Sequence, residues 1–362
     1  YYNSITFESI TLTNAGGPDL FIVKYDAMGN VLWAKNAGGI GLDEGRSTTT
    51  DVYGNVYVVG NYYNSPSITF GAITLTNAGI QDIFIVKYDA NGSVIWAKGV
   101  GGSDDDTGLS IASDATGNVY VTGWYYSPTI TFGAITLNHS IFTSANIFVV
   151  KYDALGNALW AKSSGGVGNG TGQSITTDTF GNVYVTGYYG FSITFGTDTL
   201  TNAGTYDIFI VNYDSTGNVL WAQGFGGAQW EFGSAITTDA FGNVYVAGKY
   251  ASNTITFGAT TLINTGSWDM FIAKLDATTV GNEEKKAGNE INIYPNPAND
   301  LLTINTNKPI LIEIYSLEGN LIESKKIIGT NNLTISNYAN GMYLVKFNDN
   351  TGGFSYQKLV KQ

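Results

Sequence analysis

A motif of eight residues recurs five times along this chain at a nearly constant spacing. Its fullest copies read Asp-Leu/Ile-Phe-Ile/Val-Val-Lys-Tyr-Asp, and its phenylalanine returns after 63, 64, 61 and 62 residues. The copies of that residue are Phe21, Phe84, Phe148, Phe209 and Phe271. Trp33, Trp96, Trp160 and Trp221 follow the same period. A fixed period of this length predicts one structural unit copied in tandem, and it constrains architecture far more than chemistry.

Each repeat contains four short segments of strand character. In one copy they are Ser110–Ser113, Val119–Gly123, Asn146–Tyr152 and Ala158–Lys162. An Asp-x-x-Gly-Asn/Ser sequence separates them and occurs eight times, at Asp26, Asp51, Asp89, Asp114, Asp153, Asp178, Asp214 and Asp239. Glycine at the left-handed position of a short loop predicts β-hairpins, and we expect the aspartate to cap the turn backbone. Calcium binding by these aspartates is the alternative, but a structural turn explains all eight copies.

The third segment is apolar on both of its alternating faces, as Asp82–Tyr88 shows. Four-stranded antiparallel sheets buried on both faces and repeated in tandem are typical of the blades of a β-propeller. A stacked solenoid is the competing architecture, but its repeats are usually shorter. A Thr-rich stretch between the second and third segments predicts a small projecting hairpin, or flap. Its copies begin at Ser4, Ser67, Thr129, Ser192 and Thr254.

Residues 1–278 resemble the bacterial β-propeller repeat family, the seven-bladed propeller type repeats. The resemblance rests on Asp-Ile-Phe-Ile-Val-Lys-Tyr-Asp-Ala-Asn-Gly, on Trp-Ala-Lys-Gly-Val-Gly-Gly, and on Ser-Ile-Ala-Ser-Asp-Ala-Thr-Gly-Asn-Val-Tyr-Val-Thr-Gly. It implies an all-β fold built as a propeller and no particular activity. The chain has five third segments but four of each other kind, so we expect an incomplete ring. It also begins in mid-repeat, from which we expect further sequence upstream of Tyr1.

Charge is distributed unevenly along the chain. Residues 1–284 carry 9 Lys and Arg against 23 Asp and Glu, a net charge of −14, whereas residues 285–362 carry 8 against 6, a net of +2. An acidic repeat region argues against nucleic-acid binding, because nothing there would neutralise phosphates. The chain has no cysteine, which excludes disulfides and thiolate chemistry. No apolar run is long enough for a transmembrane segment.

The repeat stops near residue 278, and the sequence changes character. Residues 279–290 are rich in Gly, Lys and Glu and are predicted to be a linker. Residues 291–362 contain roughly seven short apolar segments with an Asn-Gly turn at Asn340, which predicts a small Ig-like β-sandwich. We therefore expect two folded domains, a propeller over 1–278 and a sandwich over 291–362.

The second domain resembles the type A C-terminal sorting domain of the type IX secretion system of Bacteroidetes. The matching residues are Tyr294, Pro295, Asn296, Pro297, Leu302, Ile304, Ile314, Tyr315, Gly319, Gly341, Tyr343, Val345, Lys358, Leu359 and Val360. Ser316 and Asn320 depart from the usual Asp and Arg or Lys. The resemblance implies export to the cell surface or beyond, with the type IX machinery and its sortase as partners, and cleavage near the linker.

Catalytic groups are scarce. The one histidine, His139, falls in a flap and is predicted to be a surface substitution. Motifs such as HExxH, a phosphate-binding Gly-rich loop or a Cys/His cluster are absent from the sequence. No cofactor is expected; calcium at Asp104–Asp106 is a weaker alternative, without ordered ligand spacing.

Two features differ between repeats and are candidates for function. The first is the loop between the fourth segment and the next first segment, which contains Asp43-Glu44, Asp104–Asp106, Asn169 or Trp230-Glu231. The second is an aromatic cluster after the second segment: Tyr62, Tyr63, Trp124, Tyr125, Tyr126, Tyr188, Tyr189 and Tyr250. These rings either stack on sugars or pack beneath the flap. A secreted binding or adhesion scaffold, recognising a glycan or a surface protein, is the leading hypothesis. The alternative is a secreted hydrolase, for example one that degrades polysaccharides, with its catalytic part upstream.

Overall fold

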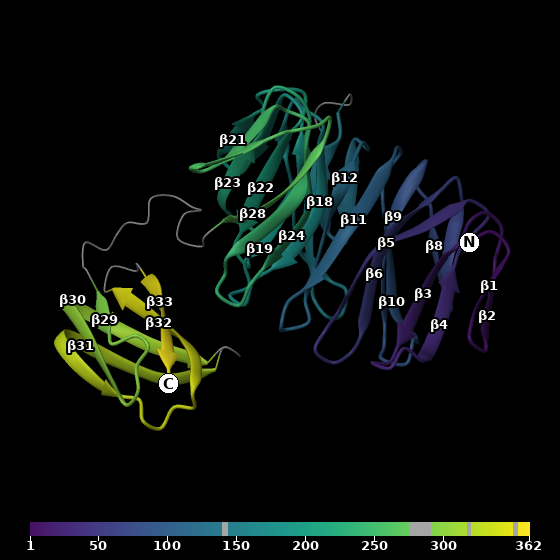
Figure 1. Cartoon of the computed structure of the whole chain (residues 1–362). Helices are drawn as coiled ribbons and strands as arrows, with labels where there is room; N and C mark the ends of the chain where they lie inside the picture. The colour runs from purple at the N-terminus through teal and green to yellow at the C-terminus, as the bar shows by residue number, and fades with distance from the viewer. Residues whose placement is uncertain (140–143, 276–290, 317–319, 350–353) are drawn as a thin grey trace. The chain divides into compact units, whose positions relative to one another are not determined.

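The computed structural model describes residues 1–139, 144–275, 291–316, 320–349 and 354–362. Every regular element in these ranges is a β-strand (Figure 1), so the predicted all-β class is confirmed. The chain divides into two compact units, Tyr1–Val280 and Gly281–Gln362. The predicted linker at 279–290 lies outside the described residues. Within the described ranges, no helix is long and apolar enough to span a bilayer.

The first unit is a series of antiparallel sheets that stand side by side as propeller blades (Figure 1). Three blades have four strands. The second contains β5 (Leu42–Thr50), β6 (Val56–Tyr63), β9 (Gln81–Tyr88) and β10 (Val94–Val100). The third contains β11 (Asp106–Ser113), β12 (Val119–Tyr125), β15 (Asn146–Tyr152) and β16 (Ala158–Ser163). The fourth contains β18 (Gly170–Thr177), β19 (Val183–Tyr189), β22 (Asp207–Tyr213) and β23 (Val219–Phe225).

The two outermost blades are partial. The first consists of β3 (Leu20–Tyr25) and β4 (Val31–Ala37), and the fifth of β24 (Glu231–Thr238), β25 (Val244–Tyr250) and β28 (Asp269–Leu275). The described residues thus contain five third strands and four of each other kind, as the sequence predicted. The first strands of neighbouring blades lie side by side, and hydroxyls join them: Ser113 Oγ donates to the Thr50 carbonyl at 2.8 Å.

The flaps are two-stranded hairpins, as predicted. They are β1 (Ser4–Phe7) with β2 (Ile10–Thr13), β7 (Ser67–Phe70) with β8 (Ile73–Thr76), β13 (Thr129–Phe132) with β14 (Ile135–Asn138), β20 (Ser192–Phe195) with β21 (Asp198–Thr201), and β26 (Thr254–Phe257) with β27 (Thr260–Ile263). A short strand, β17 (Gly165–Gly166), pairs with β20. The ring of Phe70 lies 4.9 Å from that of Phe84, which anchors the flap to the third strand. In the three four-stranded blades, the flap is therefore part of the blade's core.

The Asp-x-x-Gly turns close the hairpins as predicted. In the turn at Asp89, Oδ1 accepts from the backbone N–H groups of Asn91 and Ser93, each at 2.8 Å. Gly92 has φ of +79°, a left-handed conformation that favours glycine. A Cβ at Gly92 would also lie 2.8 Å from the ring of Trp33 in the preceding blade. Glycine here therefore serves both the turn and the contact between blades.

The repeated tryptophan links each blade to the next. Trp33, Trp96 and Trp160 donate from Nε1 to the carbonyls of Ala90, Ala154 and Ser215, at 3.1, 3.3 and 3.1 Å. Each carbonyl belongs to the turn between the third and fourth strands of the following blade. The Trp96 ring also lies between Tyr57 of its own blade and Tyr152 of the next, with centroids 6.0 and 6.4 Å away. The tryptophans therefore occupy equivalent positions in successive blades, as predicted.

Replacing Trp96 with Ala should destabilise the propeller by about 3–5 kcal/mol, because it leaves a cavity between two blades. Trp96→Phe should cost less, since it removes the hydrogen bond but retains an aromatic ring. Urea unfolding monitored by circular dichroism measures both. Trp230→Ala is the control, because Trp230 is 48% exposed and its removal leaves no buried cavity between blades. Equal losses at Trp96 and Trp230 would contradict a role in joining blades.

The second unit is one curled five-stranded sheet. Its strands are β29 (Asn292–Tyr294), β30 (Leu301–Ser316), β31 (Leu321–Thr334), β32 (Gly341–Asp349) and β33 (Phe354–Lys361). The expectation of about seven short strands is wrong in number, because β30 and β31 continue through a register shift between Thr306 and Ile310. Leu302, Ile312 and Ile314 project to one face of β30 and are fully buried, so the core lies on that face.

Candidate functional site

One end of the blades carries all of the variable segments. Because neighbouring strands are antiparallel, the eight Asp-x-x-Gly turns gather at one end. The flap connections and the loops from one blade to the next gather at the other. We call this second end the variable end. Two-faced burial makes the blades rigid, so side chains from different repeats are held in fixed positions there.

Three of the predicted ligand-binding tyrosines are core residues. Tyr62, Tyr125 and Tyr189 occupy the same position in successive blades and are at most 1% exposed. The Tyr62 hydroxyl donates to the carbonyl of Thr76 in the flap at 3.1 Å. The prediction that these three rings contact a ligand is therefore wrong. They pack beneath the flap, which was the other interpretation of this cluster.

The residues on either side of these tyrosines point elsewhere, because side chains alternate along a strand. Trp124 and Tyr126 are half-buried, and their rings meet edge to face at 5.3 Å. Burial raises the pKa of the Tyr126 hydroxyl, and the nearby Tyr206 and Asp105 raise it further. Tyr63 is also half-buried, but the ring contacts of the described residues do not connect it to this group.

A larger aromatic group continues across the fourth and fifth blades. Tyr188 contacts Tyr206 at 5.5 Å and Phe232 at 4.6 Å, both edge to face. Phe232 stacks on Trp268 at 5.7 Å and an interplanar angle of 22°. Trp268 in turn lies 6.2 Å from Trp230. These five rings come from three separate connections and two strands.

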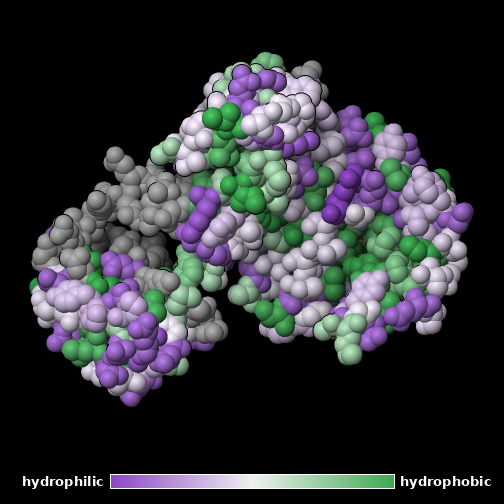
Figure 2. All heavy atoms as spheres, in the orientation of Figure 1, coloured by the Kyte–Doolittle hydropathy of each residue, from purple (hydrophilic) through white to green (hydrophobic). Residues whose placement is uncertain are grey.

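We call these five rings, together with Trp124 and Tyr126, the aromatic band. Trp230 and Trp268 are its most exposed members, at 48% and 39%. Figure 2 shows that hydrophobic and hydrophilic residues both reach the surface of this unit. The band is thus a concentrated aromatic surface made by three consecutive blades.

The structure adds residues to the site that the sequence did not indicate. Tyr206, Phe232 and Trp268 were not predicted, and Trp230 was noted only as a loop variant. Their common signal is position: each lies just before or just after the start of a first or third strand, at the variable end. Lys249 joins them, with its ammonium 5.3 Å from the Phe232 centroid and 4.9 Å from that of Trp268.

The acidic loop residues take a different role. Asp106 is fully buried and accepts from the N–H of Gly102 at 2.8 Å and from the hydroxyl of Ser127 at 2.7 Å. Asp104 and Asp105 are half-buried, so the run does not present three carboxylates to one point. No group of three or more His, Cys, Asp or Glu side chains in the described ranges is placed to hold a metal ion.

Buried carboxyl groups form pairs where two blades meet. A parallel bridge between Gln81 and Asp105 brings Asp82 of the second blade alongside Asp106 of the third. Burial raises the pKa of Asp106 to about 7, and Asp82 raises it further. Burial likewise raises the pKa of Asp43 to about 7 at the preceding interface. Each pair is therefore expected to hold a proton at mildly acidic pH.

The single histidine is not a surface residue, contrary to the sequence expectation. His139 is 4% exposed, and its ring packs edge to face on Tyr125 with centroids 5.6 Å apart. Its Nδ1 lies 3.3 Å from the carbonyl of Tyr126. His139 thus belongs to the core beneath the third flap, where the flap and the second strand enclose it.

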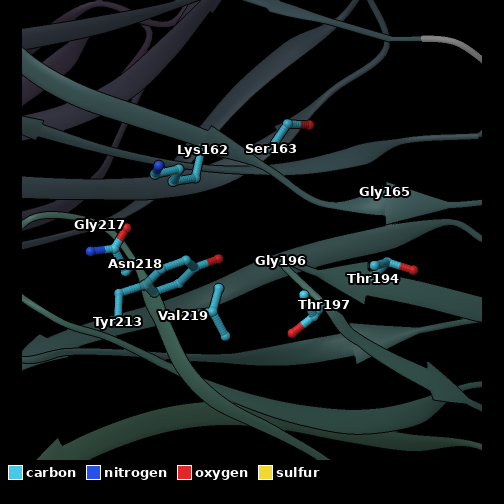
Figure 3. Close-up of a pocket in the computed structure, with 10 residues that line it drawn as sticks. All are labelled: Lys162, Ser163, Gly165, Thr194, Gly196, Thr197, Tyr213, Gly217, Asn218 and Val219. Carbon is cyan, nitrogen blue, oxygen red and sulfur yellow. The ribbon is translucent and has the colours of Figure 1, made fainter.

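A cavity of about 480 Å³ lies where the third and fourth blades meet (Figure 3). Its lining comes from the fourth strand of one blade and from the flap and last turn of the next: Lys162, Ser163, Gly165, Thr194, Gly196, Thr197, Tyr213, Gly217, Asn218 and Val219. Among these ten residues there is no carboxylate or imidazole. The cavity therefore offers no acid–base pair for hydrolysis, and the aromatic band is the stronger candidate site.

The second unit brings distant parts of the predicted sorting motif together. Asn296 Oδ1 accepts from the N–H of Val360 at 2.9 Å, and the Ala298 N–H donates to the Val360 carbonyl at 2.8 Å. Leu359 is fully buried, whereas Tyr294 is 49% exposed. The Tyr-Pro-Asn-Pro segment is therefore fastened to the end of β33.

The other residues of the predicted sorting motif lie at different places in this unit. Tyr343 is largely buried, and its hydroxyl donates to the carbonyl of Ala339 at 2.8 Å. Gly341 begins β32 with φ of +155°. Lys358 lies in β33, and Gly319 lies outside the described residues.

Comparison with known proteins agrees with this division. Residues 292–362 match the family described as the secretion system C-terminal sorting domain, and residues 160–188 match the beta-propeller repeat family. The second match runs from Trp160 of the third blade to Tyr188 of the fourth, and so spans the junction between two blades. Both recognised families are those that the sequence motifs indicated.

Relatives of known sequence cover only part of the chain. An uncharacterized WD repeat-containing protein of Acanthamoeba polyphaga mimivirus is 31% identical over 53% of this chain and 16% of its own length. The regulatory protein FlaEY of Caulobacter vibrioides is 25% identical over 59% of this chain and 22% of its own length. The chain therefore spans less than a quarter of the length of these relatives.

Solved structures give weaker similarity. Extracellular domains of a proposed one-component system and a proposed hybrid two-component system from B. thetaiotaomicron are each 12% identical to this chain. The alignments cover 88% and 99% of this chain and 57% and 54% of those chains, with TM-scores of 0.21 and 0.24.

Proposed function

We propose that this exported β-propeller, which carries the C-terminal sorting domain of the type IX secretion system, is a non-enzymatic binding or adhesion protein that recognises glycans. Its sorting domain indicates a secreted or cell-surface protein that engages the secretion machinery. The aromatic band carries the proposal of a ligand. Aromatic faces stack on the apolar faces of sugars, and ring edges and hydroxyls provide polar contacts.

The geometry of the band favours an extended ligand over a small one. Its members come from the third, fourth and fifth blades, and Trp230 and Trp268 are the rings most accessible to solvent. A polysaccharide chain offers repeated apolar faces to successive rings, which a single small molecule does not. Trp124 and Tyr126 are the members that the sequence analysis proposed as contacts.

Trp268→Ala should weaken glycan binding by about fivefold or more, because one stacking ring contributes on the order of 1 kcal/mol beyond its buried area. A glycan array on the full chain identifies ligands, and isothermal titration measures the affinity of each variant. Trp124→Ala tests the other end of the band in the same way.

Tyr53→Ala is the matched control. Tyr53 is 76% exposed and lies in an Asp-x-x-Gly turn at the opposite end of the blades, so its loss should leave affinity unchanged. Unaltered binding in both tryptophan variants would remove the band from the site. Release of sugar products from bound glycans would favour the hydrolase alternative.

A further inference from the structure

The fifth blade differs from the others at one position beside the aromatic band. The residue before the buried tyrosine of the second strand is Asn61, Trp124, Tyr188 and Lys249 in successive blades. Only the last is charged. The Lys249 ammonium lies 4.9 Å from the Trp268 centroid and 5.3 Å from that of Phe232, and the residue is exposed.

Most of the other lysine side chains of this unit lie toward the opposite end of the blades, where the Asp-x-x-Gly turns are. Lys24, Lys87 and Lys151 donate to turn carbonyls in the following blade, at 3.1, 3.0 and 3.2 Å. At the variable end, Arg46 pairs with Glu44. Among the described residues, Lys249 forms no ion pair within 4.0 Å. Its charge is thus available at the surface of the band.

The negative charge of the whole unit makes the Lys249 ammonium a distinctive site for anions. Residues 1–284 have a net charge of −14, which repels anions in general. An anionic ligand therefore needs a local cation to bind here, and Lys249 supplies one next to two stacked rings. A ligand that fits must combine an apolar face with a negative group.

We propose that the fifth blade recognises an acidic glycan, whose sugar ring stacks on Trp268 while its carboxylate or sulfate group pairs with Lys249. This inference rests on the proposed glycan-binding function and specifies its ligand class. In this arrangement the methylene chain of Lys249 packs against the rings, and its ammonium group is directed to the ligand.

The test compares matched ligands with the full chain. In the methyl ester of polygalacturonate each carboxylate is converted to an uncharged ester, and dextran sulfate and dextran form a second pair that distinguishes sulfate from carboxylate. Wild-type protein should bind the acidic member of at least one pair about fivefold more tightly, and this preference should shrink as salt rises. Lys249→Met should abolish the preference, measured as the ratio of the affinities for the acidic and the neutral member of a pair.

Lys274→Met is the control, because Lys274 also lies over an aromatic ring, 5.6 Å from the Tyr245 centroid, but at the opposite end. It should retain the acidic preference. Binding of neutral glycans without any acidic preference would overturn this inference and leave the proposed function standing. A preference that survives in Lys249→Met would also overturn it. Failure to bind any glycan would refute the proposed function itself.

Discussion

Removal of Ile291–Gln362 should keep the propeller inside the cell. This segment contains the whole five-stranded unit that matches the sorting family. In a host with a functional type IX system, the full chain is expected at the cell surface or in the medium, and the truncated chain in the periplasm. Fractionation followed by immunodetection measures the difference, which should be nearly all-or-none.

Two controls separate a sorting defect from misfolding. All seven tryptophans lie in the propeller, so their fluorescence reports whether the truncated chain still folds. Fusing residues 291–362 to a foreign periplasmic protein should carry that protein outward. We also propose that the sortase of the system cleaves near residues 279–290, which mass spectrometry of the released chain would reveal. Surface delivery of a folded truncated chain would refute the sorting role.

The propeller should lose stability as the pH rises from about 4 to about 7. Burial raises the pKa of Asp43 and of Asp106 to about 7 in the folded protein, against the ordinary value of 3.8 for an aspartate. The folded state therefore binds more protons than the unfolded state between these values, and the free energy of unfolding falls with pH across this window. Both carboxyl groups contribute to this loss of stability.

The aspartates of the Asp-x-x-Gly turns have lowered pKa values, so their effect on the pH dependence of stability is opposite. Hydrogen bonds from Asn218 and Thr216 outweigh desolvation and lower the pKa of Asp214 to about 2, and the pKa of Asp114 is lowered for similar reasons. These groups stabilise the fold above pH 4, and their contribution is lost as the pH falls through their folded values. Together the two sets predict maximal stability near pH 4 to 5.

Urea unfolding at several pH values, followed by tryptophan fluorescence, tests this profile. Asp106→Asn should flatten it, making the variant more stable than the wild type at pH 8 and little different at pH 4.5. The interface of the third and fourth blades shows that a blade junction can form without two carboxyl groups. There, Asn146 and Gly170 occupy the positions of Asp82 and Asp106. Parallel profiles for the variant and the wild type would contradict the paired-carboxyl explanation.

The sequence by itself determined the repeated unit. Turn type follows from local chemistry, since an aspartate that caps its own backbone and a glycine with positive φ act within five residues, as at Asp89 and Gly92. Apolar residues at consecutive positions, and so on both faces, determined which strands are buried on both faces. The sorting motif was also readable, because its short blocks occur in a set order.

Only the tertiary structure decided which of the variable residues meet. Tyr62, Tyr125 and Tyr189 turned inward and their neighbours outward, which depends on how the flap folds back over the strand. Tyr188 contacts Phe232, 44 residues further along, because consecutive blades pack against each other. The raised pKa of Asp106 likewise arises from burial between two blades. Such contacts have no local sequence signal, since each partner satisfies its own strand equally well without the other.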